Sequence, residues 1–362
     1  MEEEVRKKTS VAKNARKILR FLSKNRKKIS PLLILPHNYP DPDAIASAFA
    51  LKYIVEEAYG MSAKIGFGGV IGRMENRAMV KTLKIPLRKV KSSEVKKSKN
   101  VALVDTQPAF DNNPFFRSRN ATIIIDQHPS VKKPSGECVV IDTECGATSV
   151  ILAECLLLTK LRVPVNLATA LSYGILSDTQ NFYRSHSVEI MQIYLDILLH
   201  SDLKALAQIQ NPCRSRRFFK TLGKSIQNAS EHRKVLVSHL GAVDNPDLVS
   251  QIADFFLNYE KTLWAFCTGR YKGKMYVSLR GSKSNLVAGD VLRDVVPKKS
   301  QAGGHGLIAG GSFRVGKDAT PALWAQTEEQ LVQKLLKRLR VRYKKDQNFP
   351  FRDRVLKGSD KA

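Results

Sequence analysis

The sequence has no long hydrophobic run. None of its apolar stretches approaches the ~18 consecutive residues that a transmembrane helix needs. The N-terminal segment alternates lysine and arginine with apolar positions, whereas a secretory signal peptide carries one continuous apolar block. These two absences predict a soluble protein, with no membrane expected among its partners.

Cysteine is scarce as well. The chain contains five cysteines, an odd number at irregular spacings, and no Cys-x-x-Cys pair. This pattern offers neither a disulfide framework nor a paired-thiolate motif. We therefore expect free thiols that serve as small core residues, in a reducing compartment such as the cytoplasm.

Acidic residues are few relative to basic ones. Lysine and arginine number 60 against 33 aspartates and glutamates, which gives a formal net charge of +27. Such a charge attracts anions, so nucleic acid, nucleotides or an anionic surface are the expected partners. Much of the excess lies near the two ends of the chain, and any single basic run could equally be a solvated face.

The length and composition predict two ordinary globular domains. At roughly 150 residues per domain, 362 residues correspond to two. Hydrophobic residues make up 43% of the chain and charged residues 26%, which is enough to build cores and excludes global disorder. Residues 1–30 are expected to form a basic N-terminal helix, because Val11, Ala15, Ile18 and Leu22 recur at helical spacing between cations.

From Pro31 the pattern changes to short branched apolar runs that alternate with helical stretches. The runs are Leu32–Leu35, Val101–Val104 and 121–125. This alternation is typical of a parallel sheet covered on both faces, so residues 31–187 are predicted to form an α/β domain. A helical connector over 188–215 should follow.

A smaller mixed α/β domain is predicted over residues 216–341, followed by a basic tail over 342–362. Apolar runs near residues 235, 264, 275 and 312 indicate its strands, and residues 248–258 and 285–295 indicate helices. Thr327 followed by Gln330 resembles a capping box, which predicts the start of a last helix that runs through Arg340.

Metal-capable side chains stand at the tips of the apolar elements of the first domain. They are His37, Asp41, Asp43, Asp105, Asp126, His128 and Asp178. An acid at the end of a buried strand is costly unless a cation compensates its charge. Asp43 and Ser47 could instead be ordinary helix-start residues. Oxygen ligands mixed with imidazole suit Mn²⁺ or Mg²⁺, and paired divalent ions are a common device for phosphoester hydrolysis.

The loop after the first predicted strand carries a specific motif. It reads His37-Asn38-Tyr39-Pro40-Asp41-Pro42-Asp43-Ala44. This matches the pattern His-x-x-Pro-Asp-x-Asp-Ala, and the chain resembles the DHH phosphoesterase family with its associated C-terminal domain from about Pro31 to Arg340. The resemblance is closest to the nanoRNase and pAp-phosphatase branch.

The resemblance implies roles for the site residues. His37 and Asp41 would hold one divalent ion, Asp43 and Asp178 a second, and Asp105 would bridge both. Asp126 and His128 would belong to the catalytic machinery. The third family motif is Asp-His-His, but this chain reads Asp126-Gln127-His128, so the second ion should be bound weakly because an amide is a poorer ligand than imidazole.

Two segments of the second domain resemble the substrate-binding segments of the family. Gly303-Gly304-His305-Gly306-Leu307-Ile308-Ala309-Gly310-Gly311 is similar to the Gly-Gly-His signature, and Ser278-Leu279-Arg280-Gly281-Ser282 to a phosphate-binding segment. Arg280, Ser282, Gly303, Gly304 and His305 are the predicted substrate contacts. A flexible glycine turn and an ordinary arginine at a strand end are the alternatives.

The sequence thus predicts a metal-dependent phosphoesterase, with Mn²⁺ the expected ion and Mg²⁺ the alternative. Its expected substrates are short oligoribonucleotides, 3′-phosphoadenosine 5′-phosphate or both, held where the two domains face each other. The alternatives are a cyclic-dinucleotide or polyphosphate hydrolase, and a nucleotide- or RNA-binding protein in which Gln127 has impaired catalysis. The oligomeric state stays open, a homodimer included.

Overall fold

The computed structural model describes residues 9–110, 112–185, 187–282, 286–305, 307–316, 318–343 and 348–352. The chain divides into two compact units, Met1–Cys213 and Arg214–Ala362. Most of the predicted basic tail and the first eight residues lie outside the described residues. Among the described residues, no helix is both long enough and apolar enough to cross a membrane.

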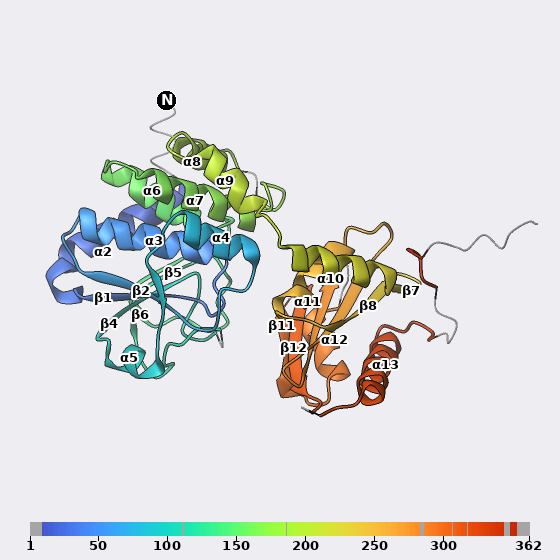
Figure 1. The fold of residues 1–362 in the computed structure, drawn as a ribbon. Helices are drawn as coiled ribbons and strands as arrows, with labels where there is room; N and C mark the ends of the chain where they lie inside the picture. The colour runs from blue at the N-terminus through green and yellow to red at the C-terminus, as the bar shows by residue number, and fades with distance from the viewer. Residues whose placement is uncertain are drawn as a thin grey trace, which may run out of the picture. The chain divides into compact units, whose positions relative to one another are not determined.

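The first unit contains a parallel sheet of six strands (Figure 1). Their order is β3-β2-β1-β4-β5-β6, and every neighbouring pair is parallel. The strands are β1 (Leu32–Pro36), β2 (Ala63–Phe67), β3 (Leu87–Lys89), β4 (Asn100–Val104), β5 (Ala121–Asp126) and β6 (Gly136–Ile141). The predicted parallel α/β domain is therefore confirmed, and its three apolar runs are β1, β4 and β5.

Helices enclose this sheet. They are α2 (Ser10–Ile29), α3 (Pro42–Glu57), α4 (Met74–Thr82), α5 (Ser92–Lys97), α6 (Thr148–Thr159), α7 (Val165–Asp178), α8 (Val188–Leu198) and α9 (Leu203–Gln210). Alternate residues of β1 enter different cores, because side chains along a strand point to opposite faces. Leu32 and Ile34 belong to the larger core, with α3, α6 and α7, whereas Leu33 and Leu35 belong to a smaller one. Both faces are covered, which explains the continuous apolar runs.

Helix α2 buries the apolar stripe expected from its sequence. Thr9 caps its first turn, and Val11, Ala15, Ile18 and Leu22 are all buried. Each fully buried Ile or Leu side chain contributes about 1.5–3 kcal/mol through the hydrophobic effect. The helix has no acidic residue, and most of its lysines and arginines are exposed. The helix therefore packs its apolar face against the first unit and presents a basic face to solvent.

Helices α8 and α9, in the segment predicted as a connector, pack within the first unit. Ile190, Ile193, Ile197 and Ile209 are buried in its larger core. The apolar stripe of these helices is what attaches them there. The chain passes to the second unit near Cys213.

The second unit contains a mixed sheet with the order β11-β12-β10-β9-β8-β7. Strands β8 and β9 are parallel, and the other pairs are antiparallel. The strands are β7 (Ser230–His232), β8 (Val235–Ala242), β9 (Trp264–Tyr271), β10 (Lys274–Gly281), β11 (Ala302–His305) and β12 (Ile308–Arg314). This confirms the predicted mixed α/β domain.

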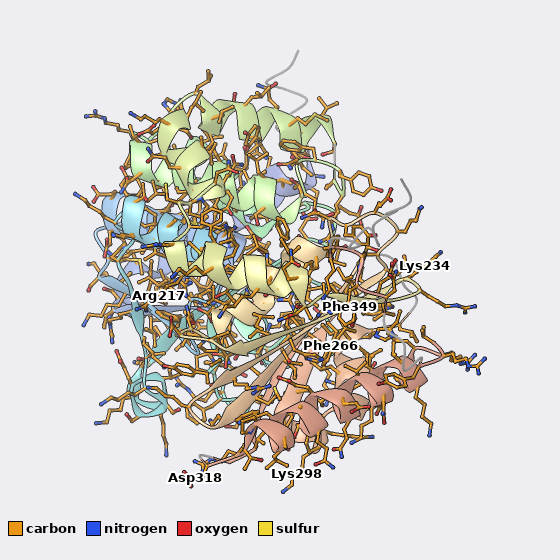
Figure 2. The ribbon with its side chains drawn as sticks, turned by 45° about the vertical axis from the view of Figure 1, so that its right-hand side comes forward. Arg217, Lys234, Phe266, Lys298, Asp318 and Phe349 are labelled. Carbon is orange, nitrogen blue, oxygen red and sulfur yellow. The ribbon has the colours of Figure 1, made fainter. Side chains whose placement is uncertain are left out.

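The helices of the second unit cover both faces of its sheet. They are α10 (Arg216–Gln227), α11 (Asp247–Phe256), α12 (Ala288–Val295), the short 3₁₀ helix η1 (Lys299–Gln301) and α13 (Pro321–Arg338). Phe266 on β9 is fully buried among residues of α12 and α13, whereas Lys234 and Lys298 are exposed (Figure 2).

The predicted start of the last helix was wrong. Helix α13 begins at Pro321, where Thr320 is the N-cap and its hydroxyl accepts a hydrogen bond from the Leu323 N–H at 3.2 Å. Thr327 lies inside the helix and donates to the Leu323 carbonyl oxygen. A proline at the first helical position needs no N–H partner, so the Thr320-Pro321 pair starts the helix earlier than the capping-box pattern.

Candidate metal centre

Three neighbouring strands bring the polar side chains of the site to one edge of the first sheet. β1 pairs with β4, and β4 pairs with β5. His37 follows β1 directly, Asp105 follows β4, and Asp126 is the last residue of β5. Because the carboxyl ends of parallel strands share an edge, these residues lie where open α/β sheets bind ligands.

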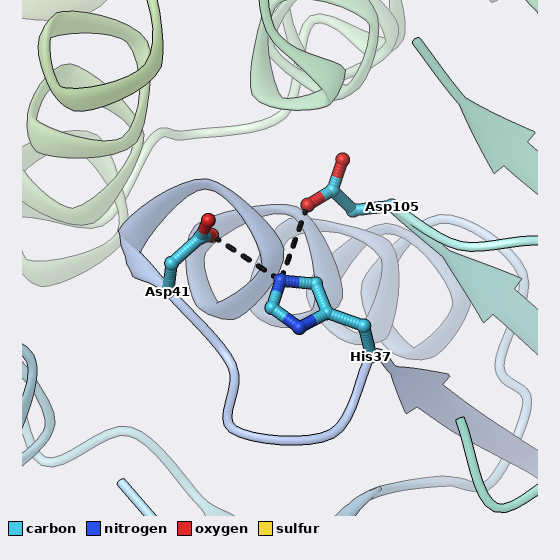
Figure 3. A group of neighbouring side chains, drawn as sticks. All are labelled: His37, Asp41 and Asp105. Atoms are coloured by element: carbon cyan, nitrogen blue, oxygen red, sulfur yellow. Dashed lines mark ion pairs between the residues drawn. The ribbon is translucent and has the colours of Figure 1, made fainter. Parts of the chain in front are cut away.

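His37, Asp41 and Asp105 form a group of potential metal ligands (Figure 3). The Nε2 atom of His37 lies 3.7 Å from Asp41 Oδ1 and 3.6 Å from Asp105 Oδ2, and the three ligand atoms are all within 4.8 Å of one another. The other ring nitrogen, Nδ1, lies 2.8 Å from the Asn38 carbonyl oxygen and donates to it. This hydrogen bond at Nδ1 keeps the Nε2 atom directed at the two carboxylates.

Two neighbouring carboxylates determine the pKa of His37. Burial alone would lower the pKa of His37, but Asp41 and Asp105 raise it to about 10. Two carboxylates within 3.7 Å of Nε2 therefore favour a positive charge at this position. A divalent ion would replace the imidazole proton, and its charge would suit the site better than one proton does.

Asp105 occupies a special backbone position. Its φ of 57° lies in the left-handed region, where aspartate is one of the few tolerated residues. The side chain is 2% exposed, and its Oδ1 accepts a hydrogen bond from the Thr148 hydroxyl at 2.8 Å. Burial and then the charge of Asp41 raise the pKa of Asp105 to about 7. A buried acid on a strained backbone is typical of a functional position.

Asp43 caps a helix other than its own. The N-cap of α3 is Asp41, whose Oδ1 accepts from the Ala44 N–H at 3.0 Å. Asp43 accepts instead from the N–H groups of Thr148 and Ser149, at 2.8 and 2.7 Å, at the start of α6. Asp43 does lie in the first turn of α3, but its carboxylate is bound to the start of α6. The N-terminus of α6 holds this carboxylate inside the site.

Asp178 reaches the site from the end of α7. A Cβ atom added to Gly174 would stand 3.0 Å from the Ala46 Cβ atom and 3.2 Å from the Pro42 carbonyl oxygen, so glycine lets α7 pack closely on α3. The Nε2 atom of Gln127 donates to Asp178 and lies 3.5 Å from Asp43 Oδ2. Burial and then the charges of Asp105 and Asp178 raise the pKa of Asp43 well above its ordinary value.

His128 is held in place by Asp126. Its Nδ1 lies 2.8 Å from Asp126 Oδ1, and this hydrogen bond is the main reason why the pKa of His128 rises to about 9. Asp126 is fully buried and also accepts from the Gln127 N–H and from Gln107 Nε2, each at 2.8 Å. The His128 ring is half-exposed, and its Nδ1 lies 3.6 Å from Asp105 Oδ1. Asp126 thus positions His128 beside the carboxylates.

The residues present fit a divalent cation. Among the described residues, two groups could hold an ion, His37 with Asp41 and Asp105, and Asp105 with Asp126 and His128. Asp43 and Asp178 lie beside them, so several carboxylates share one mostly buried site with two imidazoles. Oxygen donors with imidazole are the ligand set of Mn²⁺ and, with fewer nitrogens, of Mg²⁺.

The predicted substrate contacts of the second domain lie near one end of its sheet. Arg280 is 6% exposed, and its guanidinium donates to Asp254 and to the carbonyl oxygens of Leu279 and Ala309. A substrate phosphate at Arg280 would compete with Asp254. Ser282 is exposed, and its hydroxyl donates to the Thr262 carbonyl oxygen.

The glycine segment lies on β11. Gly303 and Gly304 are exposed, and a Cβ atom on Gly289 of α12 would stand 2.3 Å from the Gly304 carbonyl oxygen. The glycines therefore allow close packing of α12 against β11. The side chain of His305 and all of Gly306 lie outside the described residues, so the predicted role of His305 stays a prediction.

Sequence reasoning missed two residues of the site, Thr148 and Gln107. Thr148 follows Gly146 and Ala147 and opens the apolar helix α6, a small-residue helix start that could have been noticed. Gln107 follows Asp105 by two residues, and its Nε2 donates to Asp126 and to the His128 carbonyl oxygen. Both act on residues distant in sequence, which only the fold reveals.

Comparison with known proteins identifies both units. Residues 31–175 match the DHH family, N-terminal domain, and residues 232–340 match the DHHA1 domain. The uncharacterized protein MJ1633 of Methanocaldococcus jannaschii is 33% identical over 290 residues, which cover 80% of this chain. The matched region spans 59% of the length of that relative.

Two solved structures share the fold. An exopolyphosphatase-related protein from Bacteroides fragilis superposes with a TM-score of 0.66 at 13% identity, over 90% of this chain and 97% of that one. RecJ from Thermus thermophilus, in complex with Mn²⁺, superposes with a TM-score of 0.51 at 17% identity, over 89% of this chain and 55% of that one. At these identities the likeness establishes the fold alone.

Proposed function

Because the chain belongs to the DHH family of phosphoester hydrolases, we propose that it hydrolyses phosphate esters of very short oligoribonucleotides or of 3′-phosphoadenosine 5′-phosphate. The observation that carries this proposal is the convergence of His37, Asp41 and Asp105 at the sheet edge, with Asp43 and Asp178 beside them. A cluster of buried acids has no packing advantage, since each desolvated charge costs stability. Its purpose is therefore chemical.

The cluster offers ligands for divalent ions, and we propose Mn²⁺. His37, Asp41 and Asp105 would hold an ion, whereas Asp43 and Asp178 share the amide of Gln127. A bound divalent ion supplies charge that stabilises phosphoryl oxygens and lowers the pKa of water. The presence of Mn²⁺ in the Thermus thermophilus RecJ structure supports this choice of ion.

The chain's own residues supply orientation and a proton donor. The Asp126 carboxylate fixes the His128 ring and favours its protonated form, so that Nε2 can donate to a phosphoryl oxygen. Thr148 and the N-terminus of α6 hold Asp105 and Asp43 in place. These groups are fixed before a substrate arrives, which is the condition for strong electrostatic stabilisation.

Two exposed tyrosines that are close to site residues in the sequence support a nucleotide as the substrate. Tyr39 lies in the loop between His37 and Asp41 and is 64% exposed, and Tyr183 follows Asp178 by five residues and is 84% exposed. A tyrosine exposed to this degree can stack on a base, which contributes about 1–3 kcal/mol per base. The net charge of +27 would attract the phosphates. Linear polyphosphate would also be attracted by the positive charge, but it has no base that could stack on the tyrosine rings.

A substrate panel tests this function. Wild type and Asp41→Asn would be assayed in Mn²⁺ with a fluorescent trinucleotide, 3′-phosphoadenosine 5′-phosphate, a cyclic dinucleotide and linear polyphosphate. We expect hydrolysis of the first two by the wild type and none by Asp41→Asn. Tyr39→Leu should raise KM for the trinucleotide. Preferred hydrolysis of polyphosphate or of the cyclic dinucleotide would contradict the proposed substrate, and nucleotide binding without turnover of any compound would contradict an enzymatic role.

A further inference from the structure

The amide of Gln127 lies between two carboxylates. Its Nε2 atom donates to Asp178 and approaches Asp43 Oδ2 at 3.5 Å. The amide nitrogen thus faces acceptor oxygens of both carboxyl groups, and the amide oxygen points away from them. Gln127 is thus placed as a donor to these acids, not as an oxygen ligand.

Asp43 has little coordinating capacity left. Its Oδ1 accepts from the Ser149 N–H, and its Oδ2 accepts from the Thr148 N–H in addition to facing Gln127. Among the described residues, neither Asp43 nor Asp178 belongs to a group of three converging metal-capable side chains. Two groups do converge, His37 with Asp41 and Asp105, and Asp105 with Asp126 and His128. In the second group the His128 Nδ1 atom is already hydrogen-bonded to Asp126 Oδ1 at 2.8 Å, so the first group offers the freer set of ligand atoms.

We propose that the Gln127 amide takes the place of a second cation, so that the protein holds one resident divalent ion at His37, Asp41 and Asp105. The amide connects Asp43 to Asp178 through its contacts with both carboxyl groups. The proposal rests on the proposed function only in taking the site to be a metal site. Its test needs no substrate.

A second ion would meet a definite obstacle. It would have to displace the Gln127 nitrogen from Asp43 and Asp178, and the amide would have to turn over to present its oxygen. Amide oxygen is a weaker ligand than imidazole for a first-row divalent ion. The broken hydrogen bonds and the weaker ligand both reduce the affinity of the second position.

Metal counting on the whole chain tests this inference. Metal-free wild type and Gln127→His would be dialysed against increasing Mn²⁺, bound ions counted by mass spectrometry, and the loaded proteins examined by electron paramagnetic resonance. At Mn²⁺ concentrations well above those that saturate the first site, we expect the wild type to bind one ion per chain. Its paramagnetic resonance signal should be that of uncoupled Mn²⁺. Gln127→His should bind two ions and give the signal of a coupled pair. Two ions of similar affinity, or a coupled pair, in the wild type would overturn the proposal.

A second variant keeps the proposal testable if Gln127→His does not fold. Gln127→Leu has a similar volume but can neither donate nor coordinate. We expect it to bind one Mn²⁺ with unchanged affinity and to unfold at a lower temperature than the wild type without metal, because Asp43 and Asp178 lose their shared donor. Equal melting temperatures of the two metal-free proteins would show that the amide does not connect the carboxylates. Neither measurement involves hydrolysis, so failure here is distinct from failure of the proposed function.

Discussion

The Thr148 hydroxyl donates a hydrogen bond of 2.8 Å to Asp105 Oδ1, across 43 positions of sequence. The N–H of the same residue donates to Asp43 Oδ2. Helix α6 therefore begins where it can hold two carboxylates of the candidate metal centre through one residue. The geometry of the acids depends on this helix start as much as on the strands that carry them.

Thr148→Val tests this support. Valine keeps the shape and the backbone N–H but removes the hydroxyl, so Asp105 loses a partner that orients it. We expect Mn²⁺ affinity to fall by about 10–100-fold, the usual effect of removing an outer partner of a ligand. Calorimetric titration measures it. Thr159→Val at the other end of α6 is the matched control and should bind Mn²⁺ like the wild type; equal affinity in Thr148→Val would contradict the assigned role.

Gln107 is predicted to act through Asp126 and His128. Gln107→Leu removes the Nε2 donor that both residues share, while leaving His37, Asp41 and Asp105 untouched. We expect kcat to fall by about 10–100-fold with Mn²⁺ affinity unchanged. Steady-state kinetics and metal titration separate the two effects, with the exposed Gln208→Leu as control. Parallel losses of metal affinity and kcat would indicate a general disturbance of the site instead.

The sequence predicted the strands whose residues are uniformly apolar and missed those that carry charges. Runs such as Leu32–Leu35 are buried on both faces, so their composition alone marks them as central strands. Strands β3 and β6 form the two edges of the sheet and contain the charged residues Arg88 and Glu137. These charges interrupt the apolar pattern, so the two strands were not predicted. Edge strands need less burial, and their pattern is correspondingly weaker.

For the site, sequence could propose which side chains meet but not how each one is used. Residues after neighbouring parallel strands must converge, which is why His37 and Asp105 could be paired in advance. The attachment of Asp43 to α6 depends on how two distant helices pack. Gln127 was predicted as a weak oxygen ligand, whereas the structure directs its nitrogen at Asp178. Two acidic neighbours fix that orientation, and no local pattern reveals them.

His239 should make the second unit sensitive to acid. Burial lowers the pKa of His239, and its Nδ1 lies 2.8 Å from the Thr268 hydroxyl. The folded state therefore favours the neutral ring, so this contribution is complete above the unfolded pKa of about 6.5 and is lost as the pH falls below it. Urea unfolding between pH 7 and 5 can follow Trp264 and Trp324, which both lie in this unit.

The matched variant is His239→Gln, which keeps a polar partner for Thr268 but does not titrate. We expect it to lose less stability than the wild type on acidification over this range. The exposed His200→Gln in the first unit should behave like the wild type. Identical pH profiles for the wild type and His239→Gln would show that His239 does not cause the acid sensitivity.

The basic face of α2 is predicted to capture RNA without affecting the chemical step. Lys13, Arg20 and Lys24 are exposed on this helix. Replacing all three with glutamine should weaken binding of a short RNA most at low salt. The slope of log affinity against log salt should fall by about 1 for each phosphate that is no longer bound. A triple variant that preserves the charge, K13R with R20K and K24R, should bind like the wild type. A fall in kcat of the glutamine variant at saturating trinucleotide would contradict a role limited to capture.

The central claim is that one cluster of side chains both holds the metal and carries out hydrolysis, and Asp105→Ala tests it most directly. Mn²⁺ binding by calorimetry, trinucleotide hydrolysis and thermal unfolding would be measured on the same preparations of the variant and the wild type. We predict that Asp105→Ala unfolds cooperatively, loses Mn²⁺ binding, and loses at least on the order of 10²–10³-fold in kcat, the scale seen when one charge-stabilising group is removed. Hydrolysis within a few fold of the wild type in a folded variant that no longer binds Mn²⁺ would contradict the account.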